Sequence, residues 1–304
     1  MLKLKMYYMW ITNYLVGRLS CFFGTYALPP RILSIETTEV CNLKCIMCSR
    51  NITSSSREEF TLKQFEHILS VFPSINSVIL LGRGETFMMR EIFPILDLGS
   101  RKGILFTIIT NGTMLTDEVI KKIPHTGKIL VSIDHPFAEG YKEIRKGGDL
   151  GLVIAGLKKI KKIKPKQWVC VQGILMKSNA NYLNDFIKLA KDASADAVRI
   201  QQPIIFDKDS SGIYVEPSRE FDLKLKEAKK LAARLKIRFV AVPFMNKPRV
   251  CVEPWIGIRV SLKGEVYPCC YIDEVTDPTW CEWYRGVPLN VAQSNYIMGN
   301  IYRG

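Results

Sequence analysis

The chain of 304 residues has no long hydrophobic run and no credible export signal. Residues 1–5 are basic and residues 6–17 are largely apolar, as in a signal peptide, but Arg18 ends the apolar stretch early and no small-residue cleavage site follows. The run is also shorter than the roughly twenty apolar residues that cross a bilayer. We therefore expect an amphipathic helix in residues 1–30 that packs on the main domain, with peripheral membrane contact as the alternative. The residues that it would carry include Tyr7, Tyr8, Trp10 and Leu15.

Acidic residues are few, and their shortage leaves a formal net charge of +14. Such a charge suits nucleic acid, a phosphorylated substrate or an anionic membrane. The lysines are nevertheless spread through several predicted helices, which favours a solvated surface. The run from Lys158 to Lys166 lacks the interleaved aromatic residues that stack on bases, so nucleic acid is not an expected partner. Nine cysteines without an export signal indicate a reducing compartment, and we expect a cytoplasmic location.

Three of the cysteines lie within eight residues, as Cys41, Cys45 and Cys48 in a CxxxCxxC pattern. No fourth Cys or His lies within fifteen residues of this run on either side. A structural zinc site usually has four ligands, arranged in two pairs, and a [4Fe–4S] cluster normally takes four cysteines. Three thiolates can therefore hold a four-iron cluster with one iron left open. A reactive or structural thiol cluster is the alternative.

Beyond residue 31, short β-rich runs alternate with helical patterns, which indicates βα units and a parallel sheet. Right-handed crossovers should curl this α/β chain into a partial (β/α)6 TIM-like barrel over residues 31–243, with a small β-hairpin extension over 244–304. The functional loops are then expected at the C-terminal ends of the strands. The predicted strands are Ile32–Glu36, Ser77–Leu81, Ile104–Thr110, Lys128–Asp134, Trp168–Met176 and Ala197–Gln201. The predicted helices are Leu62–Val71, Glu91–Ser100, Asp117–Lys122, Leu150–Lys162, Tyr182–Asp192 and Ser218–Leu235.

The cysteine spacing, placed after the first strand, resembles the radical S-adenosylmethionine (AdoMet) enzymes. The resemblance implies a [4Fe–4S] cluster held by Cys41, Cys45 and Cys48, whose fourth iron binds the amino and carboxylate groups of AdoMet. It also implies that the reduced cluster cleaves AdoMet and that the 5′-deoxyadenosyl radical abstracts hydrogen from a substrate. Met47 stands where the family has a bulky residue that touches the adenine.

Residues 82–86, with the sequence GRGET, follow the second strand and resemble the family's GGEP element. In that element glycines permit close backbone approach, and the backbone and acid meet the ammonium of AdoMet. Gly84 and Glu85 match the element, whereas Arg83 replaces a glycine and Thr86 replaces the proline. A GxGE sequence alone would indicate an ordinary turn, but its position after this strand favours cofactor binding.

Four further polar residues are assigned to the cofactor site by the same resemblance. Asn111 follows the third strand in a TNGT sequence typical of the family, although an Asn-Gly pair alone marks a turn. Ser132 and Asp134 share one face of the fourth strand, where polar groups are costly without partners. The resemblance implies that Ser132 binds the ribose and that Asp134 binds the cofactor or contacts substrate. Arg145 resembles an arginine that pairs with the methionine carboxylate; a surface arginine is the alternative.

Residues 251–270 resemble the start of a SPASM or twitch extension, in which a cysteine, a Gly-containing hairpin and a later cysteine begin an auxiliary iron–sulfur site. The family's later cysteine cluster is absent before the chain stops, so we expect either a fragment or an incomplete auxiliary site. Buried free cysteines are the alternative. The thiols available to such a site are Cys251, Cys269, Cys270 and Cys281.

The sequence thus predicts a radical AdoMet oxidoreductase or maturase of the SPASM/twitch type. The resemblance implies a peptide or protein substrate, with carbohydrate or alcohol oxidation of a small molecule as the alternative, and a reductant such as flavodoxin or ferredoxin. Two other classes stay open. One is a non-catalytic iron–sulfur or other metal-binding module that uses the same cysteines, and the other is a radical RNA-modifying enzyme.

Overall fold

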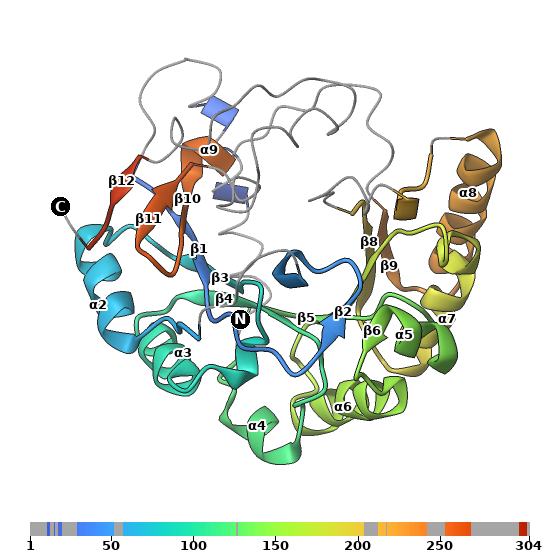
Figure 1. Ribbon diagram of the computed structural model, residues 1–304, viewed down its shortest axis with the longest axis horizontal. Helices are drawn as coiled ribbons and strands as arrows, with labels where there is room; N and C mark the ends of the chain where they lie inside the picture. The colour runs from blue at the N-terminus through green and yellow to red at the C-terminus, as the bar shows by residue number, and fades with distance from the viewer. Residues whose placement is uncertain are drawn as a thin grey trace.

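The structure, a computed structural model, describes residues 11, 12, 15, 18, 19, 29–51, 57–125, 127–203, 212–216, 218–241, 253–268 and 298–302. Figure 1 shows a curved sheet with helices along its outer side. Strands β12 and β9 form the two ends of this sheet among the described residues, so the barrel is open.

The sheet contains ten strands in the order β12-β11-β10-β1-β3-β4-β5-β7-β8-β9. All neighbours from β10 to β9 are parallel, which confirms the expected α/β fold with a parallel sheet. The predicted strand that was to reach Asp134 ends at Ser132, because the Asp134 side chain bonds the backbone of the next strand there. The parallel strands are β1 (Ile32–Glu36), β3 (Ser77–Leu81), β4 (Leu105–Thr110), β5 (Lys128–Ser132), β7 (Val169–Ile174), β8 (Ala197–Gln201), β9 (Arg238–Ala241) and β10 (Gly257–Val260).

Helices cover the outer side of the sheet (Figure 1). Four of them begin after a side chain that accepts a hydrogen bond from the first turn, and these caps are Thr61, Thr116, Asp149 and Ser218. Such caps satisfy backbone N–H groups that have no partner inside the helix. The helices are α2 (Leu62–Val71), α3 (Ile92–Arg101), α4 (Asp117–Lys122), α5 (Ala138–Ile144), α6 (Leu150–Ile163), α7 (Leu183–Asp192), α8 (Arg219–Arg234) and the short α9 (Glu253–Ile256).

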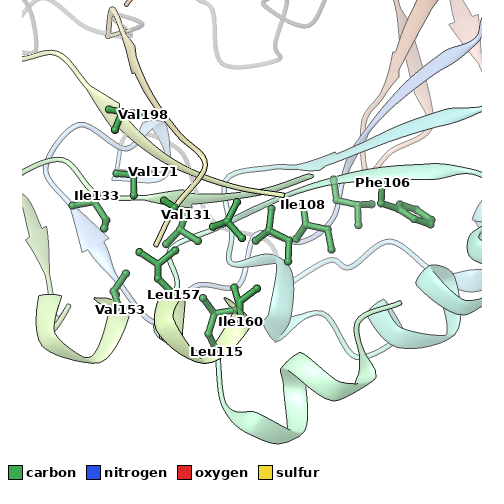
Figure 2. Close-up of a cluster of buried hydrophobic side chains, with 14 of the residues drawn as sticks. Phe106, Ile108, Leu115, Val131, Ile133, Val153, Leu157, Ile160, Val171 and Val198 are labelled. Carbon is green, nitrogen blue, oxygen red and sulfur yellow. The ribbon is translucent and has the colours of Figure 1, made fainter. Parts of the chain in front are cut away.

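The main hydrophobic core lies between the outer face of the sheet and these helices. Alternate residues of each strand point to the helices, because side chains of a strand alternate between its two faces. Ile108 of β4, Val131 of β5 and Val171 of β7 pack with Leu157 and Ile160 of α6 in this core (Figure 2). The opposite face of the sheet is thereby left for the interior of the barrel.

The C-terminal extension joins the barrel sheet through its own strands. Strand β10 pairs with β1, and the antiparallel strands β11 (Glu265–Tyr267) and β12 (Gly299–Asn300) follow it. The turn between β10 and β11 contains Gly264 at φ 83°, a value that favours glycine. The expected hairpin is therefore present. The four cysteines assigned to an auxiliary cluster, Cys251, Cys269, Cys270 and Cys281, lie outside the described residues.

Little of the N-terminal helix is described. Ile11, Thr12, Leu15, Arg18 and Leu19 are helical, and the Leu15 side chain is 53% exposed. The aromatic residues expected on this helix lie outside the described residues, so its packing stays a prediction. Within the part of the chain that the structure describes, no helix combines the length and the apolar character needed to cross a membrane.

Candidate cofactor site

The three clustered cysteines lie in the loop that follows β1. Part of this loop forms the two-residue strand β2 (Lys44–Cys45), which pairs antiparallel with β6 (Arg145–Lys146). Cys45 lies opposite Arg145, and the N–H of Ile46 donates to the carbonyl of Ile144 at 3.0 Å. This small ladder fixes the cysteine loop to the end of α5. Strands of two residues are too short to show a hydrophobic periodicity, so the pairing of β2 with β6 was not predicted from the sequence.

Polar groups from four loops surround the thiols. The backbone N–H of Leu43 donates to Cys41 Sγ at 3.4 Å, and Asn111 Nδ2 lies 3.9 Å from the same sulfur. Arg145 Nη1 lies 3.8 Å from Cys45 Sγ. Cys48 Sγ lies 4.0 Å from the carbonyl oxygen of Arg83. The structure thus brings Asn111 and Arg145, both predicted site residues, to the cysteines.

The thiols fit an iron–sulfur cluster. All three are free and partly exposed. Burial raises the pKa of Cys45 to about 11; the charge of Arg145 opposes the rise, and Asp134, Cys48 and Cys41 add to it. Among the described residues, no three His, Cys, Asp or Glu side chains are arranged to hold a single metal ion. Each thiolate of a four-iron cluster binds its own iron, so its ligands lie further apart than those of one zinc ion. Metal binding would remove the thiol proton.

Gly84 packs directly on the segment that leads to Cys41. Its N–H donates to the carbonyl of Thr38 at 2.8 Å, and the N–H of Glu85 donates to the carbonyl of Val40 at 2.8 Å. A Cβ atom at position 84 would lie 2.4 Å from the Thr38 oxygen and 2.5 Å from the Val40 oxygen. Only glycine fits here without a backbone shift. The glycine therefore does permit a close backbone approach, as expected, and the group approached is the backbone of residues 38–40.

The carboxylate of Glu85 joins the loop after β3 to the loop after β4. It is 2% exposed and accepts hydrogen bonds from Thr110 Oγ1 at 2.6 Å, from the N–H of Asn111 at 2.7 Å and from the N–H of Phe87 at 3.2 Å. Burial raises its pKa, and these hydrogen bonds oppose the rise. Glu85 is thus held by three protein donors, and its contact with the AdoMet ammonium stays a prediction.

The two departures from the GGEP pattern have partners in this fold. Arg83 forms an ion pair with Glu39, with Nη2 and Oε1 3.0 Å apart. Thr86 is buried and its hydroxyl donates to the carbonyl of Ile109 at 2.7 Å. Arg83 therefore ties this loop to the loop after β1, and Thr86 ties it to β4.

Asn111 connects the loop after β4 to the cysteine loop. Its Nδ2 donates to Asn42 Oδ1 at 2.9 Å, while its Oδ1 accepts from the N–H of Thr113 at 2.9 Å. Asn42 in turn donates to Thr113 Oγ1 at 2.8 Å. Sequence reasoning missed Asn42, although its place directly after Cys41 was a signal.

Asp134 and Arg145 form a buried ion pair beside the cysteines. Arg145 Nη2 lies 2.7 Å from Asp134 Oδ2, and their side chains are 9% and 0% exposed. Asp134 Oδ1 also accepts from the N–H of Ile174 at 2.7 Å. Arg145 Nε is buried and has no hydrogen-bond partner among the described residues. The alternative of a surface arginine is therefore wrong, and the contact of Arg145 with the methionine carboxylate stays a prediction.

The remaining assigned residues lie at the same edge of the barrel. Ser132 is half-buried at the end of β5, and Met47 is half-buried in the turn between Cys45 and Cys48. Asn179 directly precedes a short 3-10 turn, but its side chain makes no capping bond there. Its Nδ2 donates to the carbonyls of Asp134 at 2.6 Å and Ile174 at 2.7 Å, which joins the loops after β5 and β7.

A separate cavity of about 820 Å³ lies between α2 and strands β10 to β12. Its wall is mainly apolar and includes Val71, Trp255 and Met298. None of the cysteine-loop residues lines it, so it is not part of the cofactor site.

The Radical SAM superfamily model matches residues 35–190, which is about half of the chain and includes every element of this site. The chain therefore belongs to the Radical SAM superfamily. Members of this superfamily use a [4Fe–4S] cluster and AdoMet. The predicted family and its cofactors are thus confirmed.

Two relatives illustrate the range of the superfamily. An AdoMet-dependent heme synthase of Methanosarcina barkeri is 26% identical over 276 residues, covering 80% of this chain and 77% of the relative. A tungsten-containing aldehyde ferredoxin oxidoreductase cofactor-modifying protein of Pyrococcus furiosus is 24% identical over 257 residues, covering 79% of this chain and 70% of the relative.

Solved structures confirm the partial-barrel fold. Streptococcus suis SuiB bound to S-adenosylmethionine has a TM-score of 0.64 at 15% identity, covering 82% of this chain and 62% of SuiB. The chain thus spans less than two thirds of SuiB. Native anSMEcpe with bound AdoMet has a TM-score of 0.63 at 18% identity, covering 84% of this chain and 82% of anSMEcpe.

Proposed function

We propose that the chain binds a [4Fe–4S] cluster through Cys41, Cys45 and Cys48, cleaves AdoMet reductively and abstracts hydrogen from an organic substrate. One observation carries this proposal: the three thiols, Arg145 and the loop of Glu85 and Asn111 meet at the C-terminal edge of one barrel. When bound and reduced, such a cluster would supply the one electron that breaks the bond between the AdoMet sulfonium and the 5′ carbon, which is the chemistry needed for hydrogen abstraction.

The chain's own residues hold and orient these groups. Gly84 and Glu85 fix the backbone that leads to Cys41, and Asn111 holds the first turn of the cysteine loop. Arg145 places a buried positive charge beside Cys45, and its unpartnered Nε is suited to the methionine carboxylate. Ser132 offers a hydroxyl to the ribose from the end of β5.

The proposed substrate is a peptide or protein. Two neighbours support this class: the structure of SuiB bound to its precursor peptide SuiA, with a TM-score of 0.61, and the structure of anSMEcpe with the Cp18Cys peptide, with a TM-score of 0.62. A small molecule is the second candidate. It is supported by the names of sequence relatives, which include heme synthase and, at 25% identity over 261 residues, a probable GTP 3',8-cyclase. The proposal includes the SPASM/twitch subgroup and a flavodoxin- or ferredoxin-type electron donor.

The test is AdoMet cleavage by the anaerobically reconstituted protein with dithionite as reductant. We expect 5′-deoxyadenosine from the parent and none from Cys45→Ala, which should also lose cluster iron. Cys170→Ala is the matched control, because Cys170 is buried on β7 outside the cysteine loop. A parent that holds the cluster without cleaving AdoMet is a non-catalytic module. RNA binding that weakens steeply with salt would instead favour an RNA-modifying enzyme.

A further inference from the structure

Most buried basic side chains of this barrel have an acidic partner. Arg83 pairs with Glu39 and Arg145 pairs with Asp134. The third such pair, Arg259 of β10 with Glu36 of β1, is also buried. A buried charge is costly unless a counter-charge or hydrogen bonds compensate it. These three pairs therefore compensate the charges of Arg83, Arg145 and Arg259.

Three basic side chains on the other side of the barrel differ, and we call Lys128, Arg199 and Arg238 the basic cluster. They lie on β5, β8 and β9. No ion pair joins any of them to an acid within the described ranges. Lys128 and Arg199 are half-buried and Arg238 is exposed.

The strand register places the basic cluster on the inner face of the sheet. Leu130, Cys170 and Ala197 form a small apolar cluster separate from the main core, so their face is the one turned away from the helices. Lys128 precedes Leu130 by two residues and Arg199 follows Ala197 by two, which gives each the same orientation. Arg238 lies directly opposite Ala197. All three cations therefore face the barrel interior.

The three charges interact with one another. The pKa of Lys128 is lowered, first by burial and then by the charges of Arg238 and Arg199. The Lys128 ammonium lies 5.7 Å from the ring centre of Trp168, which offers it only a weak attraction. The basic cluster thus brings like charges together at an energetic cost that a bound anion would reduce.

Arg199 connects the basic cluster to the predicted cofactor site, whereas Lys128 and Arg238 begin their strands and lie deeper in the barrel. Ser132, Gln172 and Arg199 are successive neighbours in register across β5, β7 and β8. Because neighbouring strands are about 4.8 Å apart, Arg199 lies about 10 Å along the sheet from Ser132. Gln172 Oε1 between them is buried and has no hydrogen-bond partner among the described residues. A ligand that reaches from Ser132 to Arg199 would supply that partner.

We propose that Lys128, Arg199 and Arg238 bind an oxyanionic group of the substrate that carries at least two negative charges. This inference rests on the proposed function, because it identifies the substrate beside AdoMet. The group is either a phosphate ester or a pair of neighbouring carboxylates, since both offer oxygens to ammonium and guanidinium donors. Gln172 accepts a hydrogen bond from a hydroxyl or N–H group near the anion.

The test uses the full chain with its cluster and AdoMet bound, and two probes: pyrophosphate for a phosphorylated substrate and N-acetyl-Glu-Glu-amide for an acidic peptide. Calorimetry should show that at least one probe binds the parent. Lys128→Gln and Arg199→Gln should each weaken that binding about tenfold, as expected when a charge-assisted contact is lost. Whichever probe binds more tightly identifies the source of the anion.

Matched controls are Lys166→Gln and Arg234→Gln, which remove exposed charges from the loop before β7 and from α8. They should bind the probe as the parent does. Without a probe, Lys128→Gln should melt at the same or a higher temperature, because it relieves like-charge repulsion. A lower melting temperature, no binding of either probe, or equal binding by parent and variants would overturn the anion site. Charge-dependent binding in a protein that never cleaves AdoMet would instead overturn the proposed function alone.

Discussion

Arg145 forms an ion pair with Asp134, its Nη2 lying 2.7 Å from Asp134 Oδ2. The same guanidinium reaches Cys45 Sγ at 3.8 Å through Nη1. The loop after β5 therefore sets the position of a charge beside a cluster thiol that is one hundred residues away in the sequence. Both side chains are buried, so neither charge can be removed without consequence for the other.

Asp134→Asn should strongly destabilise the protein, because it leaves the Arg145 guanidinium buried without a counter-charge. We expect the free energy of unfolding to fall by about 3–5 kcal/mol, as for other broken buried pairs. Urea unfolding measures this change. Asp192→Asn removes an exposed charge at the end of α7 and should leave stability almost unchanged. A similar small effect for both variants would show that the pair is not needed to hold Arg145.

The cluster-free protein should lose stability as the pH rises above 9. The pKa of Cys45 is raised from 9.0 to about 11, chiefly by burial, so the folded state keeps a proton that the unfolded chain releases in this interval. The folded state then binds more protons, and stability falls as pH rises. The free energy of unfolding should be measured for the parent and for Cys45→Ala between pH 8 and 11, because their difference isolates the contribution of the Cys45 thiol. The difference in unfolding free energy between the two proteins should change across the interval; a constant difference contradicts the raised pKa.

Glu85→Ala should affect stability as well as AdoMet binding. The substitution leaves Thr110 and the N–H of Asn111 without their buried acceptor. An unsatisfied buried donor costs about 1–3 kcal/mol, so the free energy of unfolding should fall by at least this amount. Thermal unfolding and AdoMet titration should be measured on the same preparations. Glu118→Ala on α4, where the glutamate is exposed, is the control. Full stability in Glu85→Ala would show that the loops after β3 and β4 do not depend on this carboxylate.

Gly84→Ala should displace the loop that supports Cys41. The added Cβ would lie 2.4 Å from the Thr38 oxygen, which real structures do not tolerate. We expect a loss of about 1–3 kcal/mol in unfolding free energy, typical of overpacking, together with a lower iron content after reconstitution. Gly212→Ala is the matched control, because its Cβ would meet no atom of the described residues within 4 Å. Equal iron content in the two variants would mean that the loop adapts without moving the cysteines.

Regular elements with strong local signals were predictable. The predicted bounds of β1, β3 and β8 agree with the structure, and so do those of α2 and α4. Helix α2 shows why: Thr61 and Gln64 form a capping box directly before an amphipathic segment. Helix α5 was not predicted, because it is seven residues long and Phe137 before it provides no side-chain cap.

The site was predictable as a set of residue types but not as a set of contacts. The cysteine spacing identified the thiols, and the alternation along β5 indicated that Asp134 needs a buried partner. Nothing local indicated that this partner is Arg145, because the pair forms only when β2 and β6 meet. The domain boundaries stay predictions. The auxiliary iron–sulfur site also stays a prediction, because its four cysteines lie outside the described residues.

The last prediction concerns the attachment of the C-terminal strands to the barrel. Glu36 of β1 and Arg259 of β10 form a buried ion pair, and the N–H of Leu262 donates to Glu36 Oε2 at 3.4 Å. Glu36→Gln leaves Arg259 buried without its counter-charge, which should cost about 3–5 kcal/mol. The double variant Glu36→Gln/Arg259→Met should recover most of this loss, because no unpaired charge remains.

Asp97→Asn is the control for this prediction, because it breaks an exposed pair with Arg101 on α3 and should cost only about 0.2–0.5 kcal/mol. Urea unfolding of the parent, Glu36→Gln, Arg259→Met and the double variant closes a double-mutant cycle and gives the coupling energy between Glu36 and Arg259. A cost for Glu36→Gln no larger than that for Asp97→Asn would show that β10 is held by its backbone ladder alone. A large loss of stability in Glu36→Gln that the double variant restores would show that the buried ion pair contributes to holding β10 against β1.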